Sequence, residues 1–375
     1  ISGTTLDEFV TYNDVVADIN KIDDFVSQMS VSELARLLAV EPDNNDAQTG
    51  TGGVGGKYIS SEYGIPNANT SDGPAGIRYT NAAMYSTWMP CMTLLASTWN
   101  INLAQTYGAA VAAEAKLGNV QVWLAPGINI HRNPLCGRNF EYYSEDPLIA
   151  GMMGKYVTIG AQSLGISVCV KHFAVNNQET SRYSYNACVS NRALREIYFK
   201  PFEIIVKEAD PYAVMSSYNR VNGEYVGATY QIITDMLYNE WGFEGWIVTD
   251  MINGADYMNW RDIVFGGGGG CLTTSAYESA NIGSMTSTEN LKLIAKDSAF
   301  QKKMKETIKY FVYNTVASND MNTITTSTKY IHVLTWWQIA FMAAEVVFGL
   351  LTLLFAVMYL RNSLCKKTVY VKEDK

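Results

Sequence analysis

The sequence is poor in charged residues and in residues that bind transition metals. Charged side chains make up 17% of the 375 positions, and histidine occurs only at 131, 172 and 332. No HExxH motif is present, and the six cysteines, at positions 91, 136, 169, 188, 271 and 365, form no CxxC pair. The sequence therefore argues against a zinc or redox site, and we expect no metal ion and no organic cofactor.

Positive charge is also scarce. Lysine and arginine number 28 against 36 aspartate and glutamate residues, which gives a net charge of −8. Nucleic acids select basic surfaces, so we exclude DNA and RNA as partners. The last fifteen residues are an exception, because they carry a net charge of +3 and leave −11 for the rest of the chain.

One apolar run stands out. Residues 333–360 read VLTWWQIAFMAAEVVFGLLTLLFAVMYL, with Glu345 as their only charged residue. About 20 apolar residues in a helix cross a bilayer core, so this run predicts a transmembrane helix. Trp336 and Trp337 at one end and Tyr359 at the other suit the two membrane interfaces. A buried core helix is the alternative interpretation.

The segments that flank this run predict its orientation. Residues 361–375 form a basic tail, and positive charge beside a transmembrane helix favours the cytoplasmic side. The polar residues 318–332 predict a short linker. We therefore expect a single-pass protein of the cell membrane, with residues 1–317 outside the cell.

Ahead of the linker, strand-like and helix-like segments alternate. Short apolar segments predict strands at 67–72, 91–97, 120–125, 166–172, 212–218 and 245–250. Longer segments predict helices at 31–40, 100–117, 147–164, 191–208, 229–240, 287–297 and 299–317. This alternation favours one α/β domain over residues 1–317, a (β/α)8 TIM-like barrel. Glycine-rich segments at 41–56 and 266–270 predict a flexible loop and a loose turn.

Polar residues gather where several predicted strands end. The motifs, in chain order, are SDGPAGIR at 71–78, QVWLAPGINIHRNPLCGRNFEYYSED at 121–146, KHFAVNNQE at 171–179, VMSSYN at 214–219 and GWIVTDM at 245–251. The C-terminal tips of parallel barrel strands face one mouth, where enzymes of this architecture build their sites. The motifs therefore predict one shared site for a polar ligand.

Taken in this order, from about Asp72 to Asp250, the motifs closely resemble glycoside hydrolase family 3, the β-glucosidase and β-xylosidase family. The branch that cleaves N-acetylglucosamine carries Gly-His-Gly and Asp-Ser-His in the loop at 171–179, and both are absent here. The resemblance implies retaining hydrolysis of terminal non-reducing β-D-glycosides in carbohydrate catabolism, β-glucosidase-like. In that reaction a carboxylate attacks the anomeric carbon, and water then releases the sugar.

The resemblance also implies a role for each polar residue. Asp250 takes the position of the nucleophile. The residues in the positions that hold the terminal sugar are Asp72, Arg138, Lys171, His172, Met215 and Tyr218. Taken singly, these residues have ordinary structural interpretations, because Asp250 fits a helix cap, Asp72 a turn and Arg138 a surface salt bridge. Their joint occurrence favours the sugar site.

The chain departs from the family at two points. Met251 stands where the family usually has Trp, which weakens the aromatic wall expected of the sugar pocket. Retaining hydrolysis also needs a second, protonated carboxyl group about 5 Å from the nucleophile. The glucosidase branch carries it on an α/β sandwich domain, and the interval between Phe265 and Val333 is too short for that domain. Some members place the sandwich first, so we expect the proton donor upstream of Ile1.

Three hypotheses follow for the function. The leading one is a membrane-anchored β-glucosidase-like hydrolase whose substrate is an oligosaccharide or glycoside. The second is a catalytically degenerate, membrane-anchored carbohydrate-binding protein, and the specificity of a β-xylosidase or arabinosidase is a variant of the first. A membrane-tethered scaffold leaves the polar motifs at the strand ends unexplained.

Overall fold

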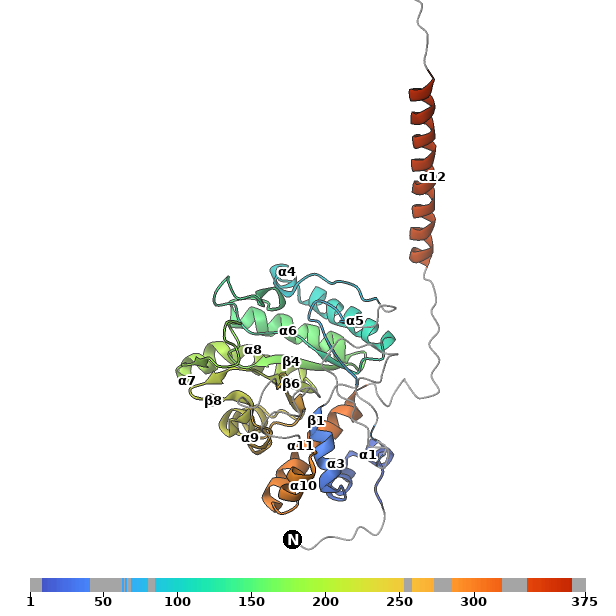
Figure 1. The fold of residues 1–375 in the computed structure, drawn as a ribbon. Helices are drawn as coiled ribbons and strands as arrows, with labels where there is room; N and C mark the ends of the chain where they lie inside the picture. The colour runs from blue at the N-terminus through green and yellow to red at the C-terminus, as the bar shows by residue number, and fades with distance from the viewer. Residues whose placement is uncertain are drawn as a thin grey trace, which may run out of the picture. The chain divides into compact units, whose positions relative to one another are not determined.

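The computed structural model describes residues 9–40, 63, 65, 69–79, 85–252, 258–272, 285–318 and 336–365. The chain separates into two compact units, Ile1–Ser327 and Thr328–Lys375. The first unit contains the α/β domain and the second contains one long helix (Figure 1). Each unit is described by itself.

A parallel sheet of five strands forms the centre of the first unit. The strands are β2 (Thr70–Asp72), β3 (Val122–Leu124), β4 (Ser167–Phe173), β6 (Ala213–Ser216) and β9 (Trp246–Thr249), and they pair in that order. Every pairing is parallel, from Thr70 opposite Val122 to Ser216 opposite Thr249. Sequence order and spatial order therefore agree, as in a barrel built from successive strand–helix units.

Two short strands extend the series. Strand β1 (Ala39–Val40) pairs in parallel with β10 (Cys271–Leu272), and a parallel bridge between Gly270 and Val248 links β10 to β9. The first and last strands are thus neighbours, as in a ring. The described part of the chain contributes seven strands to this series, against eight in the predicted barrel. The observed domain is a TIM-like α/β barrel with short closing strands.

Helices connect the strands. Those between the paired strands are α4 (Met92–Ser97), α5 (Ile101–Leu117), α6 (Pro147–Gln162), α7 (Asn191–Ala193), α8 (Lys200–Ala209) and α9 (Trp260–Gly266), with the short or π-type turns η2 (Asn139–Glu141), η3 (Leu194–Tyr198), η4 (Val226–Ala228) and η5 (Gln231–Glu240). Those near the ends of the unit are α1 (Tyr12–Ala17), η1 (Ile19–Lys21), α2 (Ile22–Ser27), α3 (Val31–Leu38), α10 (Thr288–Ile294) and α11 (Ser298–Ala317).

Most of the predicted elements are present, and one prediction is wrong. Helices occupy or overlap all the predicted helical segments in this unit, and five of the six predicted strands are strands. The segment 91–97 is helix α4 instead, which begins after Cys91 and packs against α5, α6 and η2. The glycine run at 266–270 ends helix α9, with Gly267 at a φ of 101°, and leads into β10. The segment 41–56 lies outside the described residues.

Alternating side chains of the strands enter two separate hydrophobic cores. On one face, Trp123, Val168 and Val214 pack with the helices that connect the strands. On the other face, Leu124 and Met215 join a cluster that includes residues of the terminal helices α2, α3 and α11. Because the strands are covered on both faces, the polar motifs are accessible only where the strands end.

A small sheet stands apart from the barrel series. Strands β5 (Asn186–Ala187) and β7 (Arg220–Val221) pair in parallel, and β7 pairs with β8 (Glu224–Tyr225) as a hairpin. This sheet links the chain that follows β4 to the chain that follows β6. It therefore holds two of the loops that carry polar motifs next to each other.

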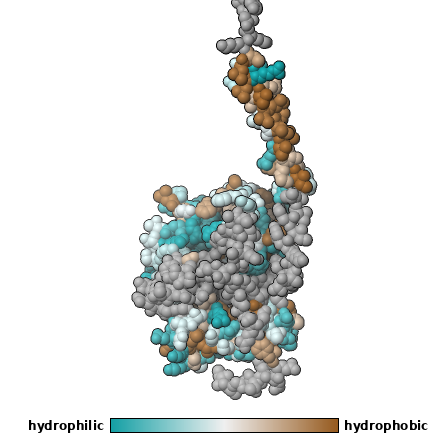
Figure 2. Space-filling view, turned by 45° about the vertical axis from the view of Figure 1, so that its right-hand side comes forward, coloured by the Kyte–Doolittle hydropathy of each residue, from teal (hydrophilic) through white to brown (hydrophobic). Residues whose placement is uncertain are grey.

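The second unit contains helix α12 (Trp336–Leu364), 29 residues long. It is the one helix among the described residues whose length and composition allow it to cross a membrane. None of its residues is buried within this unit. Apolar side chains dominate the face of this helix seen in Figure 2. The predicted linker beyond Ser318 and the tail beyond Cys365 lie outside the described residues.

Candidate active site

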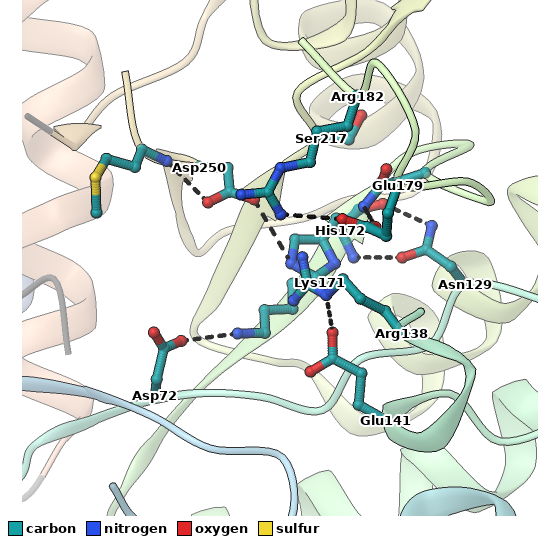
Figure 3. A network of polar contacts seen from close by, with 12 residues as sticks. Asp72, Asn129, Arg138, Glu141, Lys171, His172, Glu179, Arg182, Ser217 and Asp250 are labelled. Carbon is teal, nitrogen blue, oxygen red and sulfur yellow. Dashed lines mark hydrogen bonds and ion pairs between the residues drawn. The ribbon is translucent and has the colours of Figure 1, made fainter. Parts of the chain in front are cut away.

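The predicted site residues converge at one edge of the sheet. Asp72 is the last residue of β2, Lys171 and His172 lie near the end of β4, and Asp250 directly follows β9. Tyr218 comes two residues after β6. Because these strands are parallel, their C-terminal ends deliver the side chains to the same place (Figure 3).

Asp72 and Lys171 form an ion pair across two strands. The distance from Lys171 Nζ to Asp72 Oδ1 is 2.9 Å, and Arg78 Nη2 lies 4.0 Å from Asp72 Oδ2. Burial alone would raise the pKa of Asp72, but the charges of Lys171 and Arg78 and the hydrogen bond from Lys171 outweigh burial and lower the pKa. Asp72 is therefore an ionised acceptor of hydrogen bonds.

A tight turn fixes the position of Asp72. Gly73 has a φ of 121°, and a Cβ atom there would lie 1.8 Å from the carbonyl oxygen of Gly76. Only glycine fits this turn, which is closed by a hydrogen bond from Arg78 N to Asp72 O. The Gly-Pro motif of the sequence thus shapes the end of β2.

Asp250 is buried among cations and hydrogen-bond donors. Its Oδ1 accepts a 2.8 Å hydrogen bond from Met251 N, and the hydroxyl of Tyr218 also donates to the carboxylate. His172 Nε2 approaches Oδ2 at 3.6 Å. Burial raises the pKa of Asp250, while Arg138, Lys171 and both hydrogen bonds act to lower it, and burial prevails. The two cations favour the ionised form, but they do not fully offset burial.

His172 is neutral and is held by two neighbours, Asn129 and Tyr142, that no sequence motif indicates. Burial, followed by the charges of Arg138, Lys171 and Arg182, lowers its pKa well below the usual value. Asn129 binds the backbone of His172 twice, at 2.9 and 2.8 Å. The Tyr142 hydroxyl lies 3.3 Å from Nδ1 and accepts a hydrogen bond from the amide of Asn176.

The contacts of the two ring nitrogens fit a tautomer of His172 that carries its proton on Nε2. Because the oxygen of Tyr142 accepts from Asn176, its hydrogen is free to donate to Nδ1 of His172. The proton of the neutral ring then sits on Nε2, the nitrogen that faces Asp250. His172 therefore offers an N–H group beside the carboxylate and adds no charge.

Arg138 enters the site from the loop before η2. Its Nε forms an ion pair with Glu141, a buried residue of η2. Burial acts to lower the pKa of Arg138. The combined effect of Tyr142, Glu141 and Asp250 outweighs burial and raises the pKa, so the guanidinium keeps its charge. Glu141 thus orients Arg138.

Tyr218 lies between Asp250 and the loop that follows β4. Burial and the charge of Asp250 raise the pKa of Tyr218, so the hydroxyl stays protonated and donates to the carboxylate. The guanidinium of Arg182 packs on the ring of Tyr218, with its Cζ atom 4.6 Å from the ring centroid. Met215 is buried in the core cluster below the site, in β6.

Other polar residues of the segment 121–146 serve the scaffold. His131 Nε2 contacts the carbonyl oxygens of Asn139 and Tyr142 at 2.9 and 3.0 Å. Asp146 caps helix α6 and accepts hydrogen bonds from Leu148 N and Ile149 N. The crowding of charges in this segment therefore overstates the number of residues in the site.

The arrangement suits a polyhydroxylated ligand. It combines an ionised acceptor at Asp72, charged donors at Lys171 and Arg138, a neutral donor at His172 and a buried carboxyl group at Asp250. Within the described ranges, no group of three or more His, Cys, Asp or Glu residues has the spacing of a metal site.

Comparisons with known proteins agree with this chemistry. The sequence profile of the glycosyl hydrolase family 3 N-terminal domain matches residues 21–262, more than half of the chain. Beta-glucosidase A of Butyrivibrio fibrisolvens is 47% identical over 230 residues, which are 61% of this chain and 27% of that protein. An exo-alpha-(1->6)-L-arabinopyranosidase of Bifidobacterium longum is 45% identical over 204 residues, 52% of this chain and 27% of that protein.

Solved structures show the same likeness. Beta-glucosidase 3B of Thermotoga neapolitana superposes with a TM-score of 0.71 at 36% identity and covers 80% of this chain, which spans 43% of that structure. A β-glucosidase of Paenibacillus barengoltzii gives a TM-score of 0.74 at 34% identity, over 89% of this chain and 36% of that structure. The chain thus spans about a quarter of the curated relatives and less than half of these structures. With its profile match, its barrel and its strand-end site, the chain belongs to glycoside hydrolase family 3.

Proposed function

We propose that the chain is the barrel domain of a retaining β-glycosidase that acts on terminal, non-reducing β-D-glucosides. The observation that carries the proposal is the environment of Asp250. This carboxyl group lies at the tip of a barrel strand, between Arg138, Lys171, His172 and Tyr218, which would surround the anomeric carbon of a bound sugar. Several relatives named as β-glucosidases support glucose as the sugar.

The proposed roles follow from the charges and hydrogen-bonding capacity of each side chain. Asp250 is the nucleophile that forms the glycosyl-enzyme. Asp72 accepts hydrogen bonds from two sugar hydroxyls, and Lys171 and His172 donate to neighbouring ones. Arg138 and Tyr218 stabilise the carboxylate of Asp250, and Met215 supports the site from below.

The proton donor of the reaction is proposed to lie outside this chain. Three other carboxyl groups appear in the network of Figure 3, and each has a basic partner: Asp72 has Lys171, Glu141 has Arg138, and Glu179 has Arg182. None of the three stands unpaired beside Asp250. A separate α/β sandwich domain that contributes a carboxylic acid would complete the site. This chain matches only 27% of the length of Beta-glucosidase A, so the rest of such a protein has room for that domain.

Covalent trapping tests the nucleophile. A 2-deoxy-2-fluoro-β-D-glucoside with a dinitrophenyl leaving group needs little protonation, so the second carboxyl group is dispensable for this step. We expect labelling of the full chain at Asp250, located by peptide mass spectrometry, and no labelling of Asp250→Asn. A label on any other residue contradicts the assignment.

A second candidate is a carbohydrate-binding protein without turnover. It is favoured because each of the other carboxyl groups in the network has a basic partner and none stands beside Asp250 as a proton donor. External azide distinguishes the two, because it attacks a trapped glycosyl-enzyme without a general base. Turnover of an activated aryl glucoside with azide supports the hydrolase. Glucose binding without turnover, even with azide, supports the binding protein.

Specificity and location complete the proposal. Two relatives are named as arabinopyranosidases, so arabinose is an alternative sugar for the same site, and xylose is another. We propose that α12 spans the cell membrane with the basic tail in the cytoplasm and the barrel outside. Its 29 residues and its apolar composition support a span.

A further inference from the structure

Arg182 lies on the loop after β4, and two hydrogen bonds hold this loop close to the arginine. The loop after β4 contains Tyr185, whose hydroxyl donates to Val175 O at 2.7 Å. The Tyr225 hydroxyl donates to Tyr183 O at 3.2 Å from the hairpin of the small sheet. The position of Arg182 is therefore fixed by contacts outside its own side chain.

The guanidinium of Arg182 is held between one carboxylate and two tyrosine rings. Nη1 lies 3.0 Å from Glu179 Oε2, and Nη2 donates to the Tyr183 hydroxyl at 3.0 Å. The Cζ atom lies 4.6 Å from the ring centroid of Tyr218 and 5.0 Å from that of Tyr183. The two rings also meet edge to face, with centroids 4.8 Å apart. The ring of Tyr218 is thus wedged by two neighbours from the same loop.

This arrangement differs from an ordinary surface ion pair. The side chain of Arg182 is 29% exposed, whereas that of Arg192, which pairs with Glu196 on the surface, is 84% exposed. A planar cation that packs on a ring face fixes the ring as well as its own carboxylate. Tyr218 in turn donates its hydroxyl to Asp250, so Arg182 acts one step behind the proposed nucleophile.

We propose that Arg182 is a positioning residue, which holds the Tyr218 ring in the orientation from which its hydroxyl donates to Asp250. The inference rests on the proposed function of Asp250 as the nucleophile. Arg182 lies in the loop after β4, just beyond the motif at 171–179. Glu179 and Tyr183 hold the guanidinium in place.

The charge of Arg182 works in the same direction as its packing. It acts to lower the pKa of Tyr218 against the effect of burial, and so makes the hydroxyl a stronger donor. The other titratable or charged groups that face Asp250 are Arg138, Lys171, His172 and Cys169. When Arg182 is neutralised and these groups are kept, the Tyr218 hydroxyl becomes a weaker donor to Asp250. The pKa of His172 also loses the small lowering effect of Arg182, but burial, Arg138 and Lys171 still lower it. With the weaker donor at Tyr218, the carboxyl group of Asp250 ionises at a higher pH.

The test is the pH profile of covalent trapping in the full-length chain. The rate of labelling by the dinitrophenyl 2-fluoro-β-D-glucoside is measured in wild type and in Arg182→Met, which keeps an unbranched side chain without charge. We expect the rate to fall about tenfold and the acid limb of the profile to move to higher pH. Arg182→Lys, which keeps the cation, should recover part of the rate.

Arg261→Met is the matched control. Arg261 also pairs with a carboxylate, Asp297, and packs on two rings, those of Phe265 at 5.3 Å and Phe300 at 5.0 Å. Neither ring is in the site, so this variant should keep the wild-type profile. Thermal melting of each variant reports folding separately.

A double variant shows whether Arg182 acts through Tyr218. We expect Arg182→Met to change little in a Tyr218→Phe background, because the hydroxyl is already absent. Multiplicative effects, or a wild-type profile in Arg182→Met, overturn the inference while the proposed function stands. No label at Asp250 in wild type overturns the proposed function instead. If Arg182→Met fails to fold, Arg182→Lys alone and with Tyr218→Phe decides the question.

Discussion

Asp250 is surrounded by charges that favour its ionised form and by a buried environment that opposes it. Burial raises the pKa of this carboxyl group, and Arg138 is the strongest opposing charge, followed by Lys171. A nucleophile must be ionised to react, so its activity decreases as the pH falls through this raised pKa. The acid limb of the trapping profile should therefore lie above the usual range of an aspartate.

A paired substitution tests the part of Arg138. Arg138→Met with Glu141→Gln removes both charges and leaves no buried carboxylate without its partner. Since Arg138 acts to lower the pKa of Asp250, we expect the acid limb to move up by about one pH unit. The control is Arg192→Met with Glu196→Gln, an exposed pair that should change nothing. An unmoved limb in the first variant means that Arg138 does not act on Asp250.

The ion pair of Asp72 and Lys171 makes a separate prediction for sugar binding. Asp72→Asn removes the charged acceptor and leaves Lys171, whose side chain is 4% exposed, without a carboxylate. We expect the dissociation constant for glucose to rise about 100-fold, because charge-assisted hydrogen bonds to the sugar are lost. Isothermal titration measures this change. Arg78→Gln removes the more distant partner, 4.0 Å away, and should alter affinity less than threefold. Equal effects of the two variants would argue against a binding role for the carboxylate.

Helices α5 and α6 approach each other through two glycines. A Cβ atom on Gly108 of α5 would lie 2.0 Å from Val157 O, and one on Gly160 of α6 would lie 2.0 Å from Gln105 O. Both neighbours are backbone atoms of the facing helix, which cannot move without separating the two helices. The glycines therefore set the distance between α5 and α6.

Alanine substitutions at this contact should destabilise the barrel. We expect Gly108→Ala and Gly160→Ala each to reduce the free energy of unfolding by about 3 kcal/mol, measured by urea denaturation of the full chain. Gly137→Ala serves as the control, because no atom lies within 4 Å of a Cβ atom there. If all three variants unfold at the same urea concentration, the helices have room to separate.

The elements also show what the sequence can predict. Helices α5 and α6 begin at residues with recognisable caps, Asn100 and Asp146, so their starts follow from local rules. The segment 91–97 fails as a strand because a short apolar run reads alike in a strand and in a buried helix. Within this segment, the Thr93 hydroxyl donates to the carbonyl oxygens of Asn139 and Tyr142, which lie 46 and 49 residues away in the sequence. Such tertiary contacts decide the element and leave no local signal.

The residues of the site also fall into two groups, those that local motifs predict and those that depend on tertiary contacts. The residues at the strand ends, from Asp72 to Asp250, stand in motifs that a single sequence displays. Tyr142, Asn129 and Arg182 were missed, because their effect depends on contacts across separate loops. The only sign of Arg182 in the sequence is that Glu179 stands three positions before it in a predicted loop. Such a spacing of an acidic and a basic residue most often indicates a surface ion pair.

Two native cysteines test the proposed orientation of the chain in the membrane. Cys188 is exposed on the first unit, and Cys365 is exposed at the end of α12. If α12 spans the membrane with its basic end inside, a membrane-impermeant maleimide should label Cys188 in intact cells and label Cys365 only after permeabilisation. Peptide mass spectrometry identifies each site, and Cys188→Ser and Cys365→Ser verify the two signals. Labelling of both cysteines in intact cells would rule out the span, and labelling of Cys365 alone would invert the orientation. Because the barrel carries the sugar site, the same result decides whether a glycoside outside the cell can reach Asp250 without first crossing the membrane.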